Sequence, residues 1–149
     1  ALGLQSFVKT TGGKGLHVQA PVVPAEEWDA VHAFCKAVAE AVVAHAPDRY
    51  TATMSKAKRR GKIYVDWVRN TRGATSIAPY STRAREQATV AVPLRWDELR
   101  PDLRPDSYTM ENIARRLGQL KGDPWEGWEE AWRNQTLRAA MDKVADLAH

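Results

Sequence analysis

The sequence predicts an α/β fold of the α+β kind, in which helices flank a mainly antiparallel sheet. Two apolar or alternating runs meet at a glycine-rich turn, a pattern typical of an antiparallel hairpin. Residues 25–45 repeat apolar side chains at intervals of three and four, as a helix with one buried face does. The same spacing returns near the C-terminal end and predicts further helices. With 149 residues, 44% of them hydrophobic, the chain can form one domain with a buried core.

Five segments predict the strands, and prolines mark several of their ends. Pro21 and Pro24 end the second strand because proline has no N–H to donate, and Pro93 stops the fifth for the same reason. Pro24 also suits the start of the following helix, where Glu26 and Glu27 favour the positive end of the helix dipole. The expected strands lie near residues 3–9, 15–22, 62–69, 74–79 and 89–92.

The last third of the chain predicts short helices joined by surface turns. Trp125, Trp128 and Trp132 recur every three or four residues, which favours packing against the sheet over stacking on nucleobases. The expected elements are a helical turn at 96–99, a helix around 113–120, a helix that carries the tryptophans, and a helical end at 138–149.

Positive charge is concentrated in the middle of the chain. The net charge is +4, but residues 49–85 hold ten Lys or Arg and one acid, Asp66. This favours an anionic partner, with nucleic acid as the leading candidate. The single cysteine, Cys35, excludes an internal disulfide and a multi-cysteine zinc site. No apolar run reaches about 18 residues, so we expect a cytoplasmic protein without export signal or membrane span.

The segment from Thr11 to Val18 places three glycines, a lysine and a histidine between two predicted strands. Glycine lets the backbone turn tightly and bring N–H groups close to an anion, and Lys14 adds a positive charge there. His17 stands at the start of the outgoing strand, with its ring directed at whatever the loop holds. Phosphate binding is one interpretation, and a plain β-turn with a solvated lysine is the other.

Two further features of the basic middle suggest a nucleic-acid role. Residues 51–62 lack apolar periodicity and predict an exposed basic loop, which either binds nucleic acid or is simply a solvated face. Asp66 lies within the predicted strand 62–69, where aspartate is unfavourable. A carboxylate there needs a partner, and both a metal ion and a neighbouring arginine remain open.

Four motifs follow one another in a fixed order: Gly12–Val18, Lys62–Asn70, Arg72–Thr75 and Ala78–Arg85. Together they resemble the polymerase domain of bacterial DNA ligase D, in the archaeo-eukaryotic primase superfamily, and the resemblance extends to Asp123-Pro124-Trp125. A stand-alone polymerase with the same domain fits equally well. The resemblance implies a catalytic core with a sheet like that of an RNA-recognition motif.

The resemblance also implies roles for individual residues. Thr11, Lys14, His17 and Arg83 would contact the triphosphate of the incoming nucleotide, with Thr11 in place of the more common serine. Asp66 would be a catalytic ligand of Mn²⁺ or Mg²⁺, and His17 would also be catalytic. The basic loop would place the template and primer end, with Arg59 catalytically important. The implied DNA-binding residues are Lys56, Lys58, Arg59, Arg60 and Lys62.

One departure from the family is large. The first family motif, an Asp-x-Asp that supplies two more metal ligands, does not occur before Thr11. We therefore expect residues 1–149 to be the C-terminal portion of the polymerase domain, and inactive when isolated.

The implied function is template-dependent, primase-like nucleotide addition to DNA ends in non-homologous end joining. Ribonucleotides would be preferred, and the expected partners are a Ku-type end-binding protein and a ligase, at the bacterial nucleoid. The alternative is a basic DNA-binding module without catalysis. A phosphate-binding metabolic domain is a third interpretation, but it would not need the basic loop.

Overall fold

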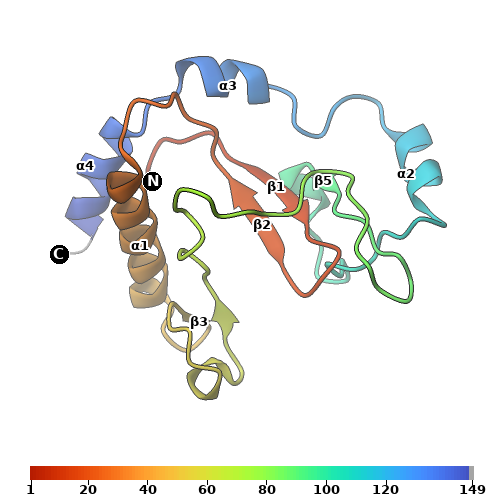
Figure 1. Ribbon diagram of the computed structural model, residues 1–149, viewed down its shortest axis with the longest axis horizontal. Coiled ribbons are helices and arrows are strands. Elements are labelled where there is room, and N and C mark those ends of the chain that lie inside the picture. The colour runs from red at the N-terminus through yellow and green to blue at the C-terminus, as the bar shows by residue number, and fades with distance from the viewer. Residues whose placement is uncertain (148–149) are drawn as a thin grey trace. The chain divides into compact units, whose positions relative to one another are not determined.

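The computed structural model describes residues 1–147, and the chain forms two compact units (Figure 1). One, the sheet unit, contains the glycine loop and the only three-stranded sheet within residues 1–147. The other, the helical unit, contains the long helix and the basic loop. The sheet unit consists of Gln5–Val22 and Ser76–Gln135, and the helical unit of Ala1–Leu4, Val23–Thr75 and Thr136–His149.

The sheet of the sheet unit is antiparallel, as the sequence predicts. Its strands are β1 (Phe7–Thr10), β2 (Leu16–Gln19) and β5 (Pro93–Leu94), in the order β2-β1-β5. Val8 pairs with Val18 on one side and with Leu94 on the other. All four residues of β1, the central strand, are buried, because packed side chains cover both of its faces.

The two faces of β1 bury different clusters. Val8 joins Val90, Val92 and Leu94 in an aliphatic core, while Phe7, on the opposite face, packs against tryptophans. The ring of Phe7 lies 6.0 Å from that of Trp125 and 5.2 Å from that of Trp128, centroid to centroid. Partly buried side chains complete the aliphatic core: Leu99, Leu103, Tyr108 and Ile113.

The tryptophan prediction holds for two of the three residues. Trp125 is buried, stacks on Trp128 with centroids 4.7 Å apart, and donates from Nε1 to the Val8 carbonyl oxygen at 2.9 Å. Trp132 is 50% exposed, so for this residue the prediction is wrong. The other elements of the unit are η2 (Trp96–Glu98), α2 (Ile113–Gln119) and α3 (Trp128–Asn134), in which Trp132 lies.

The helical unit is organised around α1 (Trp28–His45), which packs against α4 (Arg138–Leu147) and β3 (Tyr50–Thr51). Phe34 and Ala39 are its buried residues, and partial burial raises the pKa of the Cys35 thiol. Helix α1 starts at Trp28 rather than at 25, because Glu27 is extended at its N-cap. The last two residues of the expected helical end lie outside the described range. Within residues 1–147, no helix is long and apolar enough to cross a membrane.

Three strand predictions need correction. The predicted strand 62–69 is shorter in the structure, where only β4 (Ile63–Tyr64) forms because the chain turns soon after it. Strand β4 pairs in parallel with β3. Residues 74–79 form no strand. Residues 89–92 contribute isolated bridges, and the strand lies one step later, at Pro93–Leu94. Proline is tolerated there because β5 is an edge strand, which needs N–H donors on one side only.

Candidate functional site

The glycine loop of the sheet unit is closed by its own hydrogen bonds. The Thr11 hydroxyl donates to the Gly15 carbonyl oxygen at 2.8 Å and accepts the N–H of Gly13 at 3.2 Å. The Thr11 N–H also donates to the Gly15 carbonyl oxygen. The hydroxyl therefore shapes the loop, and its contact with a triphosphate stays a prediction.

Gly12 is the position in this loop that requires glycine. Its φ of 62° lies in the left-handed region, and a Cβ would lie 3.2 Å from both the Thr89 hydroxyl and the Val90 carbonyl carbon. The N–H of Gly12 donates to the Pro105 carbonyl oxygen, and the Thr89 hydroxyl donates to the Gly12 carbonyl oxygen at 2.5 Å. The N–H groups of Gly12 and Gly13 thus bind the protein itself.

Arginine side chains approach this loop from residues 83–85. Arg83 donates from Nε to the Thr11 carbonyl oxygen at 3.0 Å, and its own N–H is held by the Thr89 carbonyl oxygen at 2.7 Å. A Cβ on Gly13 would lie 3.6 Å from Nη2 of Arg85 and 4.0 Å from Nη2 of Arg83. Two arginines therefore add positive charge to the loop, which also carries Lys14. Sequence reasoning assigned Arg83 and missed Arg85, although the Arg-x-Arg spacing was visible.

Lys14 and His17 also belong to the sheet unit. Lys14 is exposed in the loop, and His17 is partly buried on β2. His17 pairs with Lys9 across the two strands, so the two side chains share one face of the sheet. The predicted triphosphate contacts all lie in the sheet unit. Thr11 and Lys14 are in the glycine loop, His17 is on β2, and Arg83 reaches the loop from a later segment.

Lys9 is the second residue that sequence reasoning missed. It lies in the centre of β1 with 1% of its surface exposed, and its Nζ donates to the carbonyl oxygen of Ile77. Burial, reinforced by the nearby charge of Arg83, lowers the pKa of its ammonium group. The available signal was a lysine directly after Phe7 and Val8 in a predicted strand.

Asp66 belongs to the helical unit and lies after β4 rather than within a strand. Its Oδ1 accepts the N–H of Val68 at 3.2 Å, and its Oδ2 lies 3.7 Å from Nε of Arg69. A carboxylate is suited to this turn because it accepts the N–H two residues later. Of the two partners left open, the neighbouring arginine lies within ion-pair distance.

Apart from the exposed carboxylate of Asp66, the described residues offer no grouped ligands for the predicted metal ion. Within residues 1–147, no group of three or more His, Cys, Asp or Glu side chains is placed to hold a metal ion. Asp66 is exposed and can offer one hard oxygen ligand, of the kind that Mg²⁺ and Mn²⁺ prefer.

The basic loop connects β3 to β4 and contains the short helix η1 (Ala57–Arg59). Arg59 is held in place: its Nε donates to the Thr53 carbonyl oxygen at 3.1 Å, and its guanidinium lies 3.6 Å from the ring centroid of Tyr64. Lys62 donates from Nζ to the Pro47 carbonyl oxygen at 2.7 Å.

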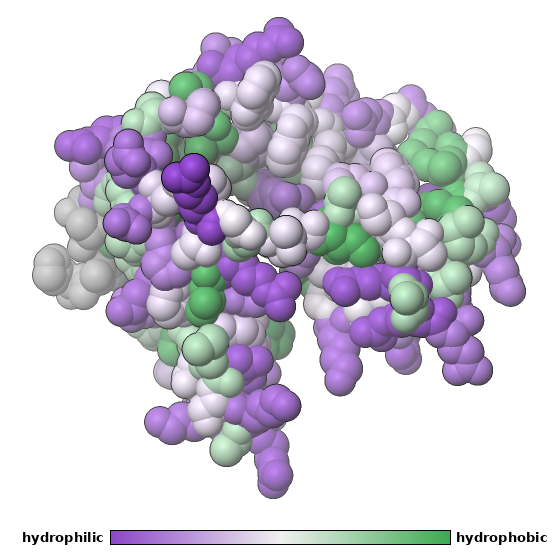
Figure 2. All heavy atoms as spheres, in the orientation of Figure 1, coloured by the Kyte–Doolittle hydropathy of each residue, from purple (hydrophilic) through white to green (hydrophobic). Residues whose placement is uncertain are grey.

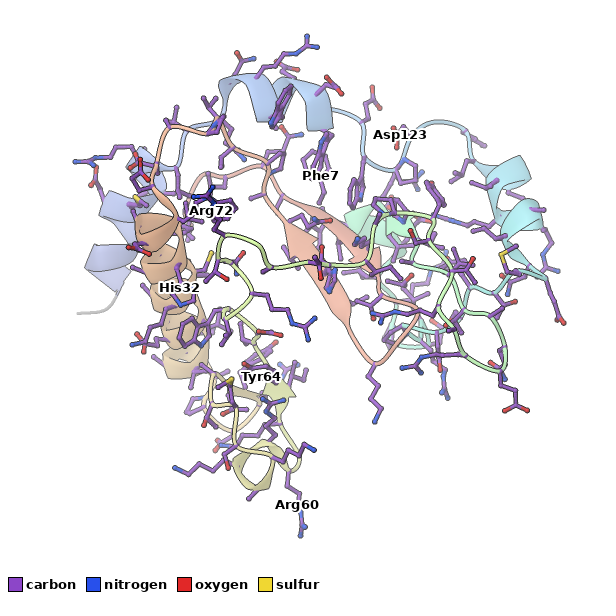
Figure 3. All side chains as sticks on the ribbon, in the orientation of Figure 1. Phe7, His32, Arg60, Tyr64, Arg72 and Asp123 are labelled. Carbon is purple, nitrogen blue, oxygen red and sulfur yellow. The ribbon has the colours of Figure 1, made fainter. Side chains whose placement is uncertain are left out.

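The remaining cations of the basic loop face solvent. Lys56, Lys58 and Arg60 are exposed, and Arg60 extends from the tip of the loop (Figure 3). Hydrophilic side chains cover this tip, at the bottom of the view in Figure 2. The loop thus combines two anchored cations with three that are available to a polyanion.

The chain matches one protein family over most of its length. The family described as "LigD, primase-polymerase domain" matches residues 1–125. The chain is 39% identical over 141 residues to the multifunctional non-homologous end joining protein LigD of Pseudomonas aeruginosa, covering 94% of this chain and 16% of that protein. It is 32% identical over 145 residues to the bifunctional LigD of Bacillus subtilis, covering 97% of this chain and 24% of that protein.

A solved structure has the same fold. The polymerase domain from Mycobacterium tuberculosis ligase D in complex with DNA matches with a TM-score of 0.72 and 33% sequence identity. The match covers 95% of this chain and 44% of that one. The chain therefore spans less than half of the polymerase domain structure and about a sixth of the P. aeruginosa relative.

Proposed function

Because this chain belongs to the LigD primase-polymerase family, we propose that it serves template-dependent nucleotide addition to DNA ends. The names of its relatives describe non-homologous end joining, and the similar solved structure is a complex with DNA. On this proposal the substrates are a nucleoside triphosphate, with ribonucleotides preferred, and a DNA end with template and primer. A Ku-type end-binding protein and a ligase are the proposed partners, at the nucleoid in the cytoplasm.

The observation that supports this proposal most directly is the contact of Arg83 with the glycine loop. The guanidinium of Arg83 bonds the Thr11 carbonyl oxygen, while its Nη2 and that of Arg85 lie beside Gly13. Arginine offers several N–H donors in a planar fork that matches phosphate oxygens. Together with exposed Lys14, these side chains are suited to a triphosphate and to the charge that develops on the leaving pyrophosphate.

Asp66 is the proposed metal ligand, but alone it does not make a metal site. A divalent cation held in part by Asp66 would supply activation of the primer hydroxyl and stabilisation of the attacked phosphate. The exposed carboxylate of Asp66 fits such a cation in chemistry, because ionised carboxylate oxygens are its preferred ligands. Within residues 1–147, no group of three or more His, Cys, Asp or Glu side chains completes such a site.

The basic loop is the proposed DNA contact. Its exposed cations can bind backbone phosphates without reading base sequence, as the joining of arbitrary ends requires. Two cations of the loop keep a defined position, because Arg59 stacks on Tyr64 and Lys62 bonds the Pro47 carbonyl oxygen. The exposed cations are Lys56, Lys58 and Arg60. We assign Arg59 the catalytic role implied by the family.

Primer extension tests the proposal. The natural protein that contains these residues is given a DNA end with a recessed 3′ terminus, Mn²⁺ and labelled UTP. We expect extension by the wild type, at least a hundredfold loss in Asp66→Asn, and full activity in Asp48→Asn, which removes an exposed acid elsewhere in the helical unit.

The outcomes separate the two candidate functions. Absence of extension by the wild type, with DNA binding retained, would favour the DNA-binding module without catalysis. Extension by Asp66→Asn at the wild-type rate would show that Asp66 is not a metal ligand. Residues 1–149 alone are expected to bind triphosphate and DNA without extending a primer.

A further inference from the structure

Lys9 occupies a position where a lysine is energetically unfavourable. Its side chain is the largest fully buried one, with 1% of the residue exposed, in the central strand of the sheet unit. Burying a charged amine is strongly unfavourable unless partners compensate for the lost hydration. Among the described residues no carboxylate forms an ion pair with Lys9, and its hydrogen-bond partner is the Ile77 carbonyl oxygen. Stability of the fold therefore does not explain this lysine.

The bond to Ile77 connects Lys9 to the segment that carries Arg83. This segment, 76–83, contains no strand of its own. Its later part is anchored through the backbone, because Tyr80 donates to the Ala91 carbonyl oxygen at 2.6 Å and Arg83 to the Thr89 carbonyl oxygen at 2.7 Å. The ammonium group of Lys9 provides an anchor for the part that precedes Tyr80.

Lys9 also adds positive charge near the glycine loop. It lies one residue before the end of β1, on the sheet face that it shares with its pair partner His17. Burial and, after it, the charge of Arg83 lower the pKa of the Lys9 ammonium group, so the two cations lie close enough to repel each other. A polyanion bound at the loop would relieve this repulsion.

We propose that Lys9 is a positioning residue for triphosphate binding, whose ammonium group holds the 76–83 segment so that Arg83 is presented to the glycine loop. This inference rests on the proposed function of that loop. Lys9 does not contact the triphosphate, since its side chain is buried, and it acts through Arg83.

The test compares stability with affinity in the 149-residue chain. Inorganic triphosphate is the probe, titrated by calorimetry, and urea unfolding measures stability. Lys9→Met keeps the length of the side chain and removes the amine, so we expect affinity to fall about tenfold. The urea concentration at the unfolding midpoint should stay the same or rise, because replacing a buried charge by an apolar side chain is often stabilising. Lys121→Met, an exposed lysine of the same unit, should change affinity less than about twofold.

Two further variants show whether Lys9 acts through Arg83. In an Arg83→Met background, Lys9→Met should lower the affinity by less than about twofold, since the side chain that it positions is gone. In a Cys35→Ser background, Lys9→Cys can be aminoethylated while unfolded and then refolded. Restoring the amine in this way should return affinity to within about threefold of the background.

Each of these results supports or overturns the positioning role of Lys9. Equal affinity of Lys9→Met and the wild type, a full tenfold loss in the Arg83→Met background, or no recovery on aminoethylation would overturn the positioning role. If Lys9→Met does not fold, the aminoethylated chain still tests the proposal. A wild-type chain that does not bind triphosphate removes the proposed function of the loop, and the role of Lys9 falls with it.

Discussion

Arg83 donates a hydrogen bond from Nε to the carbonyl oxygen of Thr11, 3.0 Å away, and so joins the glycine loop to a residue 72 positions later. The bond uses the inner nitrogen of the guanidinium, while Nη2 lies on the side of Gly13. One side chain thus stabilises the loop and directs donors beside it.

Arg83→Lys tests whether one guanidinium both holds the loop through Nε and offers a donor to the triphosphate through Nη2. Lysine keeps the charge but cannot donate from Nε to Thr11 and offer a second planar donor at the same time. We expect triphosphate affinity to fall by roughly 10- to 100-fold, as removal of a charged hydrogen bond of about 1.5–3 kcal/mol would cause. Calorimetric titration of the 149-residue chain measures it. Arg133→Lys, on the exposed side of α3, is the control, and an equal loss there would contradict a specific role for Arg83.

Gly12→Ala tests the conformation of the loop. The positive φ of 62° and the close approach of Thr89 and Val90 leave little room for a Cβ, so we expect a loss of about 1–3 kcal/mol in the free energy of unfolding. Gly15→Ala is the matched control, because a Cβ there meets no atom within 4 Å. Urea unfolding of both variants gives the comparison. Similar losses at the two positions would show that crowding at Gly12 is not the cause.

The basic loop gives a prediction about salt. Lys56→Gln, Lys58→Gln and Arg60→Gln in one chain remove three exposed charges and leave the anchored Arg59 and Lys62 in place. We expect weaker binding of single-stranded DNA. The slope of log affinity against log salt should become shallower by about 0.7 for each phosphate that the loop no longer neutralises. Fluorescence anisotropy at several salt concentrations measures both.

A control with the same change in net charge separates local contact from general attraction. Arg115→Gln, Lys121→Gln and Arg133→Gln remove three exposed charges from the sheet unit. An equal change of slope in this variant would mean that the basic loop makes no specific contact with DNA.

The sequence predicted the parts of this fold that depend on local patterns. The hairpin of β1 and β2 follows from alternation around the glycine loop, and α1 follows from its apolar period. The predicted strand around Asp66 was wrong, because an aspartate that accepts the N–H of Val68 stabilises a turn more than its apolar neighbours stabilise a strand.

The missed parts of the candidate site depend on contacts between distant residues. Lys9 stood in a predicted strand, but its burial follows from the pairing of β1 on both sides and from the Ile77 carbonyl. The resemblance implied a role for Thr11 at the triphosphate, which stays a prediction, whereas its hydrogen bonds to Gly13 and Gly15 depend on loop closure. Spacing reveals which residues are near in sequence, whereas these contacts depend on how the backbone folds.

The ion pair of Glu98 and Arg116 gives a prediction about acid stability. Both Nη atoms of Arg116 donate to the Glu98 carboxylate. The side chain of Arg116 is 14% exposed and that of Glu98 is 19% exposed. Burial works against ionisation of Glu98, but the hydrogen bonds from Arg116 and from the Arg95 N–H outweigh it, so the pKa of Glu98 lies below its ordinary value. A carboxylate with a lowered pKa stabilises the fold above its unfolded pKa of about 4.3, and this stabilisation is lost as pH falls below that value.

Glu98→Gln should therefore lower the free energy of unfolding at pH 7 by about 1–3 kcal/mol, because Arg116 keeps its charge in a mostly buried place. The difference between the variant and the wild type should shrink as pH falls from about 4.3 toward 3, where Glu98 becomes protonated in the wild type as well. Urea unfolding across this pH range measures the difference. Asp97→Asn is the control, since its carboxylate pairs with Arg95 at the exposed surface, and its effect at pH 7 should be smaller. A constant difference between Glu98→Gln and the wild type from pH 7 to pH 3 would show that the ion pair is not the source of the stabilisation.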